Sequence, residues 1–242
     1  MNDLKFHNKK FEAVISDEFP NHNGPITETD ALDLFCLDCE DFLFDPADYE
    51  TLSKFKNIDH LDICIATNDL SFLSHFPYME HLRLEFHGKT FDFSTFPDLE
   101  YLEELELFGG TFSSLSFENL DILSKLPRLH HLTFHEFGFL DLAPLTKIPQ
   151  LSSLYCGYAS KVINLHKLEE IPHLDCLTLI DISAPDLSFL EGLNRDIYLT
   201  LSGVSLENDP DWKILDQFPR CNAHDLLFRN FPVPKFPDTY VY

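Results

Sequence analysis

Basic residues are scarce in this sequence. Lysine and arginine together number 17 against 41 aspartates and glutamates, which gives a formal charge of −24 with histidine neutral. Nucleic acid and anionic lipid are bound through cationic surfaces that displace counterions, so this balance argues against both as partners. It favours a basic protein partner attracted over long range, although excess negative charge can also serve solubility alone.

Long apolar runs are absent as well. No window reaches the roughly 18 apolar residues that a membrane-spanning helix needs. The opening segment, MNDLKFHNKKFEAVISDEF, contains no apolar core of the kind found in secretory signals. We therefore expect a soluble, cytoplasmic protein with no membrane partner.

The sequence also lacks the spacing motifs of common catalytic and metal sites. Cys36 and Cys39 have the spacing of half a zinc site, but no second Cys or His pair follows at ligand spacing. The six cysteines form no secreted-type disulfide framework. No nucleophile elbow, phosphate-binding loop, dinucleotide fingerprint or metalloprotease motif is present. We expect reduced cysteines, no catalytic residues, no metal and no cofactor.

The sequence does contain a repeated motif. Six segments read apolar–Pro–x–apolar, and most run directly into L-x-x-L-x-L, as in Leu151-x-x-Leu154-x-Cys156. The segment DLSFL at 69–73 recurs at 186–190 and reveals one more, weaker copy. Nine strand starts result: Leu34, Ile58, Met79, Leu102, Leu129, Leu151, Leu174, Asp196 and Cys221.

These starts are 21 to 27 residues apart, which is the spacing of leucine-rich repeats. We predict an α/β leucine-rich-repeat solenoid of about nine repeats, with a curved parallel sheet on the concave side and short 3₁₀ or α segments on the convex side. Residues 116–125 and 209–217 are long enough for true helices. The expected domains are an N-terminal cap (1–33), the repeats (34–228) and a C-terminal capping tail (229–242) rich in proline and aromatic residues.

The run from Asp141 to Leu154, DLAPLTKIPQLSSL, resembles the short repeat of bacterial internalins. The start is similar to that family's cap, with a short helix at 9–19 followed by ITETD at 26–30. The resemblance covers about residues 9 to 228. It departs at the slot where the family carries asparagine, because this chain has mostly apolar residues there, including Phe137, Ile182 and Val204. We expect apolar packing to hold those turns.

The register predicts which strand side chains point outward on the concave face. Acidic residues gather on the first five strands, with histidines at the border and aromatic residues beyond. The candidate partner-binding residues are Asp38, Asp59, His60, Asp62, Glu80, His81, Arg83, Glu85, Glu103, Glu104, Glu106, Phe108, His131, His135, Tyr155 and Tyr158.

Two arguments connect this face with binding. Asp38, Asp62 and Glu106 are expected to stack as like charges, which costs stability unless a basic partner neutralises them. Exposed aromatic residues beside them are the anchors that protein interfaces favour. The competing interpretation is that any solvated strand face carries charge.

The histidines allow a further interpretation. His60, His81 and His131 occupy the same slot on their strands, where acidic neighbours are expected to raise their pKa values. A metal-dependent hydrolase built on this His/Asp/Glu cluster therefore stands as an alternative. The favoured hypothesis is a non-catalytic protein-binding module, specifically an immunity protein or antitoxin that neutralises a basic toxin. An effector or adhesin that binds a host protein is the other alternative.

Overall fold

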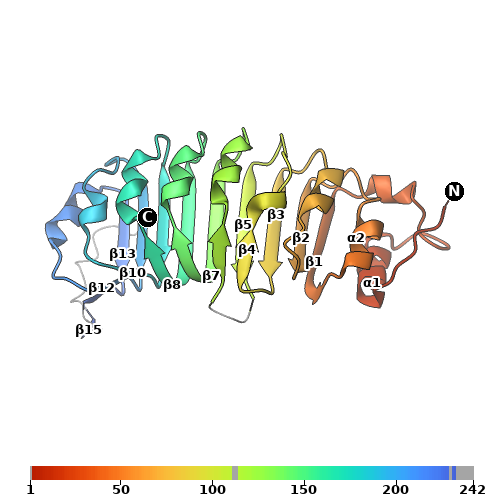
Figure 1. The fold of residues 1–242 in the computed structure, drawn as a ribbon, viewed down its shortest axis with the longest axis horizontal. Helices are drawn as coiled ribbons and strands as arrows, with labels where there is room; N and C mark the ends of the chain where they lie inside the picture. The colour runs from red at the N-terminus through yellow and green to blue at the C-terminus, as the bar shows by residue number, and fades with distance from the viewer. Residues whose placement is uncertain (1, 111–113, 229–230, 233–242) are drawn as a thin grey trace.

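The computed structural model describes residues 2–110, 114–228 and 231–232, which form an elongated stack of repeats (Figure 1). Within these residues, nine parallel strands follow one another in chain order across one sheet. The predicted leucine-rich-repeat solenoid is therefore confirmed. The strands are β1 (Cys36–Leu43), β2 (His60–Ile65), β3 (His81–Phe86), β5 (Glu104–Gly109), β7 (His131–Asp141), β8 (Ser153–Ile163), β9 (Cys176–Ile180), β11 (Tyr198–Ser202) and β13 (Cys221–His224).

The strand register follows the predicted spacing except at its C-terminal end. The predicted strand starts align Asp196 with Cys221, whereas in the structure Cys221 pairs with Leu199, three residues further along. The slot predicted for Cys221 is filled by Phe218, which is buried. In the preceding repeat, exposed Asp196 leaves the apolar slot to its neighbour Ile197, which is fully buried. Both differences have the same cause. Burying Asp196, or the polar segment that begins at Cys221, would cost desolvation energy, so the nearby apolar residues Ile197 and Phe218 are buried instead.

A second row of short strands runs beside the first. It contains β4 (Thr90–Asp92), β6 (Ser116–Glu118) and the C-terminal halves of the long strands β7 and β8. It continues as a separate sheet of β10 (Ser183–Ala184), β12 (Ser205–Leu206), β14 (Leu227–Phe228) and β15 (Phe231–Pro232). β15 is antiparallel to β14, so the parallel ladder ends there. The rest of the predicted capping tail lies outside the described residues.

The chain returns between strands mainly through 3₁₀ segments. They are η2 (Ser71–His75), η3 (Phe93–Thr95), η4 (Leu120–Lys125), η5 (Ala143–Lys147), η6 (Leu165–Glu170), η7 (Ser188–Leu190) and η8 (Trp212–Gln217). A further 3₁₀ segment, η1 (Asp30–Asp33), lies before the first strand. The expectation of α-helices at 116–125 and 209–217 is wrong, because the first begins as strand β6 and both contain 3₁₀ turns instead. One α-helix, α2 (Pro46–Leu52), serves as a return segment in the first repeat.

Aspartates begin many of these return segments. In the duplicated DLSFL segments, Asp69 and Asp186 each accept hydrogen bonds from the backbone N–H two residues later, at 3.1 and 2.8 Å. Asp92 does the same for Ser94 and also accepts a bond from the Asn119 amide of the next repeat. The duplicated motif is thus a capping device that fixes where each 3₁₀ turn starts.

Residues with a left-handed backbone conformation lie directly before the positions where the internalin family carries asparagine. Backbone φ is positive at Glu136, Tyr158, Asp181, Gly203 and Asp225, one for each successive repeat. The residue after each is buried and apolar: Phe137, Ala159, Ile182, Val204 and Leu226. The left-handed residue turns the backbone so that its successor enters the core. Apolar packing therefore holds these turns, as the sequence predicted; Ala66 and His87, at the same slot earlier in the chain, are exposed.

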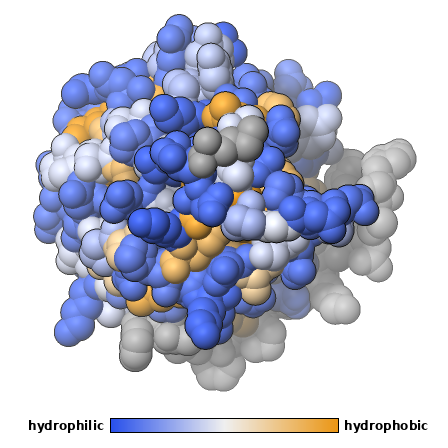
Figure 2. All heavy atoms as spheres, turned by 90° about the vertical axis from the view of Figure 1, so that its right-hand side faces the viewer, coloured by the Kyte–Doolittle hydropathy of each residue, from blue (hydrophilic) through white to orange (hydrophobic). Residues whose placement is uncertain are grey.

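The predicted N-terminal helix is present as α1 (Lys9–Glu18), which begins at an Asn8 cap. Its fully buried residues Phe11 and Ile15 face the core, where the Phe11 ring lies against the rings of Phe42, Phe44 and Phe55 at 6.3, 5.0 and 6.2 Å between centroids. Figure 2 faces this end and shows mainly hydrophilic residues around a smaller hydrophobic area. The helix covers the core of the first repeat, whose apolar residues otherwise end the stack.

Candidate functional site

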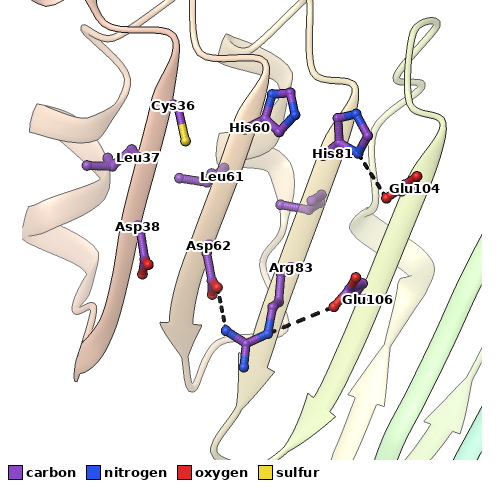
Figure 3. Close-up of a pocket in the computed structure, with 11 residues that line it drawn as sticks. Cys36, Leu37, Asp38, His60, Leu61, Asp62, His81, Arg83, Glu104 and Glu106 are labelled. Atoms are coloured by element: carbon purple, nitrogen blue, oxygen red, sulfur yellow. Dashed lines mark hydrogen bonds and ion pairs between the residues drawn. The ribbon is translucent and has the colours of Figure 1, made fainter.

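Two rows of side chains cross the exposed face of strands β1, β2, β3 and β5 (Figure 3). The first row is Cys36, His60, His81 and Glu104, and the second is Asp38, Asp62, Arg83 and Glu106. They line a hollow of about 240 Å³. The rows form because parallel strands in register place the same repeat position side by side about 4.8 Å apart.

Arg83 organises the second row. Its guanidinium pairs with Asp62 on one side and lies 4.0 Å from the Glu106 carboxylate on the other. It also donates to Glu40 at 2.6 Å and lies 4.2 Å from the centre of the Phe108 ring. The predicted stacking of Asp62 against Glu106 is therefore wrong, because the strand of Arg83 runs between them. Asp38 and Asp62 remain direct neighbours.

Burial alters the pKa values of this network. Burial raises the pKa of Asp62 by more than the hydrogen bond from Arg83 lowers it. Burial also lowers the pKa of Arg83, but the hydrogen bonds to Glu40 and Asp62 outweigh that effect and raise it above its ordinary value. Among the described atoms, Asp62 Oδ1 is buried without a hydrogen-bond partner. The row thus retains an acceptor that Arg83 does not satisfy.

His60 and His81 form a stacked pair in the first row. Their ring centroids are 4.0 Å apart with an angle of 23° between the planes. Each ring has its own carboxylate, with His60 Nδ1 2.7 Å from Asp59 and His81 Nδ1 3.0 Å from Glu104. Two imidazoles stacked face to face do not converge on one ion. His131 lies on β7, beyond Glu104, where its Nε2 is 3.4 Å from the Thr133 hydroxyl.

The aromatic candidates gather beside the acidic ones. His135 lies among Phe108, Tyr155 and Tyr158, with ring centroids 4.9, 5.9 and 4.8 Å away. Burial lowers the pKa of His135 more than the nearby Glu136 carboxylate raises it. The pKa of His135 falls because burial disfavours the charged imidazole. Tyr158 is 47% exposed, so the cluster presents an aromatic surface to solvent.

The other predicted residues lie around these groups. Glu80 and Glu103 occupy neighbouring strand starts, where Glu103 N–H donates to the Glu80 carbonyl at 2.9 Å. The Glu103 carboxylate lies 3.9 Å from Arg128. Glu85 follows Arg83 on β3 and pairs with His87 at 2.9 Å. All the predicted residues thus belong to one strand face, with the acidic ones on β1 to β5 and the aromatic ones centred on β7 and β8.

Two groups of metal-type donors occur in the described part of the chain, and neither contains His60, His81 or His131. Two members of the first group, which is Asp38, Glu40 and Asp62, already pair with the Arg83 guanidinium, namely Glu40 and Asp62. The second is Cys64, Glu85 and His87. Sequence reasoning missed Cys64 and His87, although the predicted register itself places Cys64 beside Glu85.

The fold and this face together define a class, a parallel-sheet solenoid of short leucine-rich repeats with an acidic strand face. No family model and no curated protein matches the sequence. Two solved structures from Listeria monocytogenes share the fold. The internalin InlF matches with a TM-score of 0.67 and 16% identity over 92% of this chain and 64% of that chain. Internalin C2 (InlC2) matches with a TM-score of 0.65 and 18% identity over 92% of this chain and 94% of that chain.

The architecture is therefore that of an internalin-like leucine-rich-repeat protein, as the sequence resemblance indicated. At these identities the likeness establishes the fold alone. The chain spans just under two thirds of the length of InlF. None of the described helices is long and apolar enough to cross a membrane.

Proposed function

We propose that this protein is a non-catalytic binding module whose acidic strand face receives a basic protein partner. The observation that carries the proposal is the imbalance of charge on that face. Arg83 is the one lysine or arginine among the predicted site residues, and its guanidinium already pairs with Glu40 and Asp62. Asp38 and Glu80 form no ion pair among the described residues and are open to cationic side chains from outside. The carboxylates of Asp59, Glu85, Glu103 and Glu104 already lie beside His60, His87, Arg128 and His81.

The neighbouring features suit the same partner. The hollow over β1 to β5 provides a recess for a long basic side chain. The carboxylates of Glu104 and Glu106, which line this hollow and are partly exposed, are acceptors for the N–H groups of that side chain. The exposed aromatic group around Tyr158 supplies an apolar contact beside the charges. Electrostatic complementarity of this kind increases association rates and discriminates against acidic competitors.

Within this function, the specific role that we propose is neutralisation of a basic toxin by an immunity protein or antitoxin acting in the cytoplasm. Such a role requires a strongly acidic surface that covers an electropositive active site. The acidic half of the strand face, together with the charge of −24, meets that requirement.

The proposal is tested by partner capture with matched charge variants. One variant carries Asp38→Asn, Glu80→Gln and Glu103→Gln on the strand face. Its control carries Glu118→Gln, Glu169→Gln and Glu191→Gln, exposed residues of the second strand row and the return segments, with the same change of charge. The captured protein is identified by mass spectrometry, and its binding is measured against salt concentration.

We expect a basic partner whose association slows at least about tenfold with the strand-face variant and whose affinity falls with salt. The control variant is expected to bind as the wild type does. An acidic or neutral partner, or equal loss in both variants, would contradict the proposal. A basic nuclease or other toxin encoded beside this chain supports the immunity role, whereas a host protein as partner supports an effector or adhesin.

A further inference from the structure

Three donor side chains meet beside the acidic rows, outside the hollow described above. Cys64 Sγ, the Glu85 carboxylate and a ring nitrogen of His87 all lie within 4.8 Å of one another. Cys64 and Glu85 are direct partners on β2 and β3, and His87 follows Glu85 by two residues. Strand register therefore brings a sulfur, an oxygen and a nitrogen together at one point.

The surroundings keep these atoms in place. Cys64 is buried, although its position alternates with core residues, and its thiol donates to the Glu40 carbonyl at 2.9 Å. His87 Nε2 lies 2.9 Å from Glu85 Oε1. The His87 ring lies over Gly110, where a Cβ atom would come within 3.1 Å of ring atoms. Glycine at 110 thus leaves the space that the imidazole occupies.

The combination of donors points to a particular class of ion. Magnesium and calcium take oxygen ligands, whereas a thiolate and an imidazole suit zinc and similar borderline metals. Zinc binds sulfur, nitrogen and carboxylate oxygen at about 2.0–2.3 Å, so small side-chain rotations are enough to close this trio around it. Glu85 and His87 are partly exposed, with side-chain exposures of 28% and 36%, which leaves an open side for a water ligand.

We propose that Cys64, Glu85 and His87 form a binding site for Zn²⁺ or a chemically similar divalent metal. The Cys64 thiol releases its proton to solvent when the metal binds, and water supplies the fourth ligand. Bound metal links β2 to β3 at the ends of these strands, next to Phe108 on β5. The site shares Glu85 with the candidate partner-binding residues, whereas Cys64 and His87 lie outside that set, and metal binding is measured without the protein partner.

The first measurement is titration of the full, reduced chain with Co²⁺ under a non-thiol reductant. Cobalt bound to a thiolate produces a charge-transfer absorption that oxygen and nitrogen ligands do not give. We expect one equivalent of this signal, displaced by Zn²⁺, and its loss in Cys64→Ser. His87→Ala is expected to weaken Zn²⁺ binding at least about tenfold, since even outer-shell partners contribute about 10–100-fold.

Matched variants separate this site from its neighbours. Cys36→Ser removes an exposed cysteine of the same sheet, and His60→Ala removes a histidine of the stacked pair; both are expected to keep the cobalt signal. Glu85→Gln, at a partly exposed position, provides a test if Cys64→Ser does not fold. A missing cobalt signal in the wild type, or a signal that survives Cys64→Ser and disappears in Cys36→Ser, would overturn the proposal.

Discussion

Arg83 shows how one residue determines the state of a whole charged surface. Its positive charge lies among Asp62, Glu40 and Glu106, so replacing it with glutamine leaves carboxylates facing one another. We expect Arg83→Gln to lower the free energy of unfolding by about 1.5–3 kcal/mol at pH 7, the range for hydrogen bonds to charged groups. Urea denaturation measures this loss.

Arg220→Gln is the matched control. Arg220 also lies over an aromatic ring, that of Tyr198, at 4.6 Å, but its guanidinium donates a hydrogen bond to the backbone carbonyl of Asp196 instead of a carboxylate. It is expected to cost clearly less than Arg83→Gln. Equal losses from both variants would mean that the aromatic contact, not the carboxylate network, is what Arg83 contributes.

Side-chain pairing was the least predictable part of the candidate site. The sequence register correctly placed the acidic and aromatic residues on one face, because alternation along a strand is a strong rule. It did not reveal that Arg83 separates Asp62 from Glu106, although Arg83 occupies the intervening strand. Nor did it reveal that burial sets the pKa of His135, since that depends on rings contributed by two neighbouring strands.

At the scale of elements, the aspartate caps of the 3₁₀ segments give the protein a defined acid response. Hydrogen bonds from the Ser188 side chain and backbone lower the pKa of Asp186. A lowered folded-state pKa stabilises the fold above the unfolded value of about 3.9, and this contribution disappears as pH falls through the folded-state pKa. Asp186→Ala is therefore expected to cost about 0.5 kcal/mol at pH 7, the low end for an exposed cap.

The difference between wild type and Asp186→Ala should shrink toward zero as pH falls below the unfolded-state pKa of about 3.9 and the cap protonates. Urea unfolding at a series of pH values measures it. Asp209→Ala, at an exposed aspartate of a nearby return segment, is expected to change stability little at any pH. A cost for Asp186→Ala that stays constant with pH would show that the ionised cap is not its origin.

The type of return segment could not be predicted from the sequence. Residues 116–125 contain enough apolar positions for a helix, but Ser116–Glu118 pairs with β4 and with the end of β7 instead. The competing interaction is a strand ladder with residues more than twenty positions away, which local periodicity does not encode. The Asp caps, by contrast, lie in a segment that repeats in the sequence, at Asp69 and Asp186.

For the molecule as a whole, stability is expected to be regional. Each repeat contacts mainly its neighbours, so damage at one end should not spread evenly. Phe11→Ala removes the fully buried ring that α1 places against the first repeat, a change worth about 3–5 kcal/mol in a protein core. We expect faster amide hydrogen exchange in β1 and β2, with β9 and β11 nearly unchanged.

Phe218→Ala, at the opposite end, should give the reverse pattern. Phe218 is buried in the last repeat, where Arg195 lies over its ring at 4.8 Å. Hydrogen exchange followed by mass spectrometry resolves the two ends. A uniform loss of protection in either variant would show that the repeats unfold as one unit.

The overall architecture was predictable because the same spacing of apolar residues recurs in each repeat. Eight of the nine strand starts could be aligned from apolar spacing, and their register is the observed one. The ninth prediction was wrong at Cys221. In this last repeat either Phe218 or Cys221 could begin the apolar pattern, and the structure buries Phe218. Inside the solenoid, the repeats on both sides fix the alignment of an ambiguous strand, but the last repeat has a neighbour on one side only.

The left-handed column from Glu136 to Asp225 has a consequence for how such a chain can change in length. Each coil in this stretch carries its own turn-forming residue and its own buried successor, so it is a self-contained module. Duplication or deletion of one coil preserves every local requirement of the backbone. The modular stretch lies on the C-terminal side of the acidic strands, so evolution can lengthen or shorten the solenoid there while the charged surface stays intact.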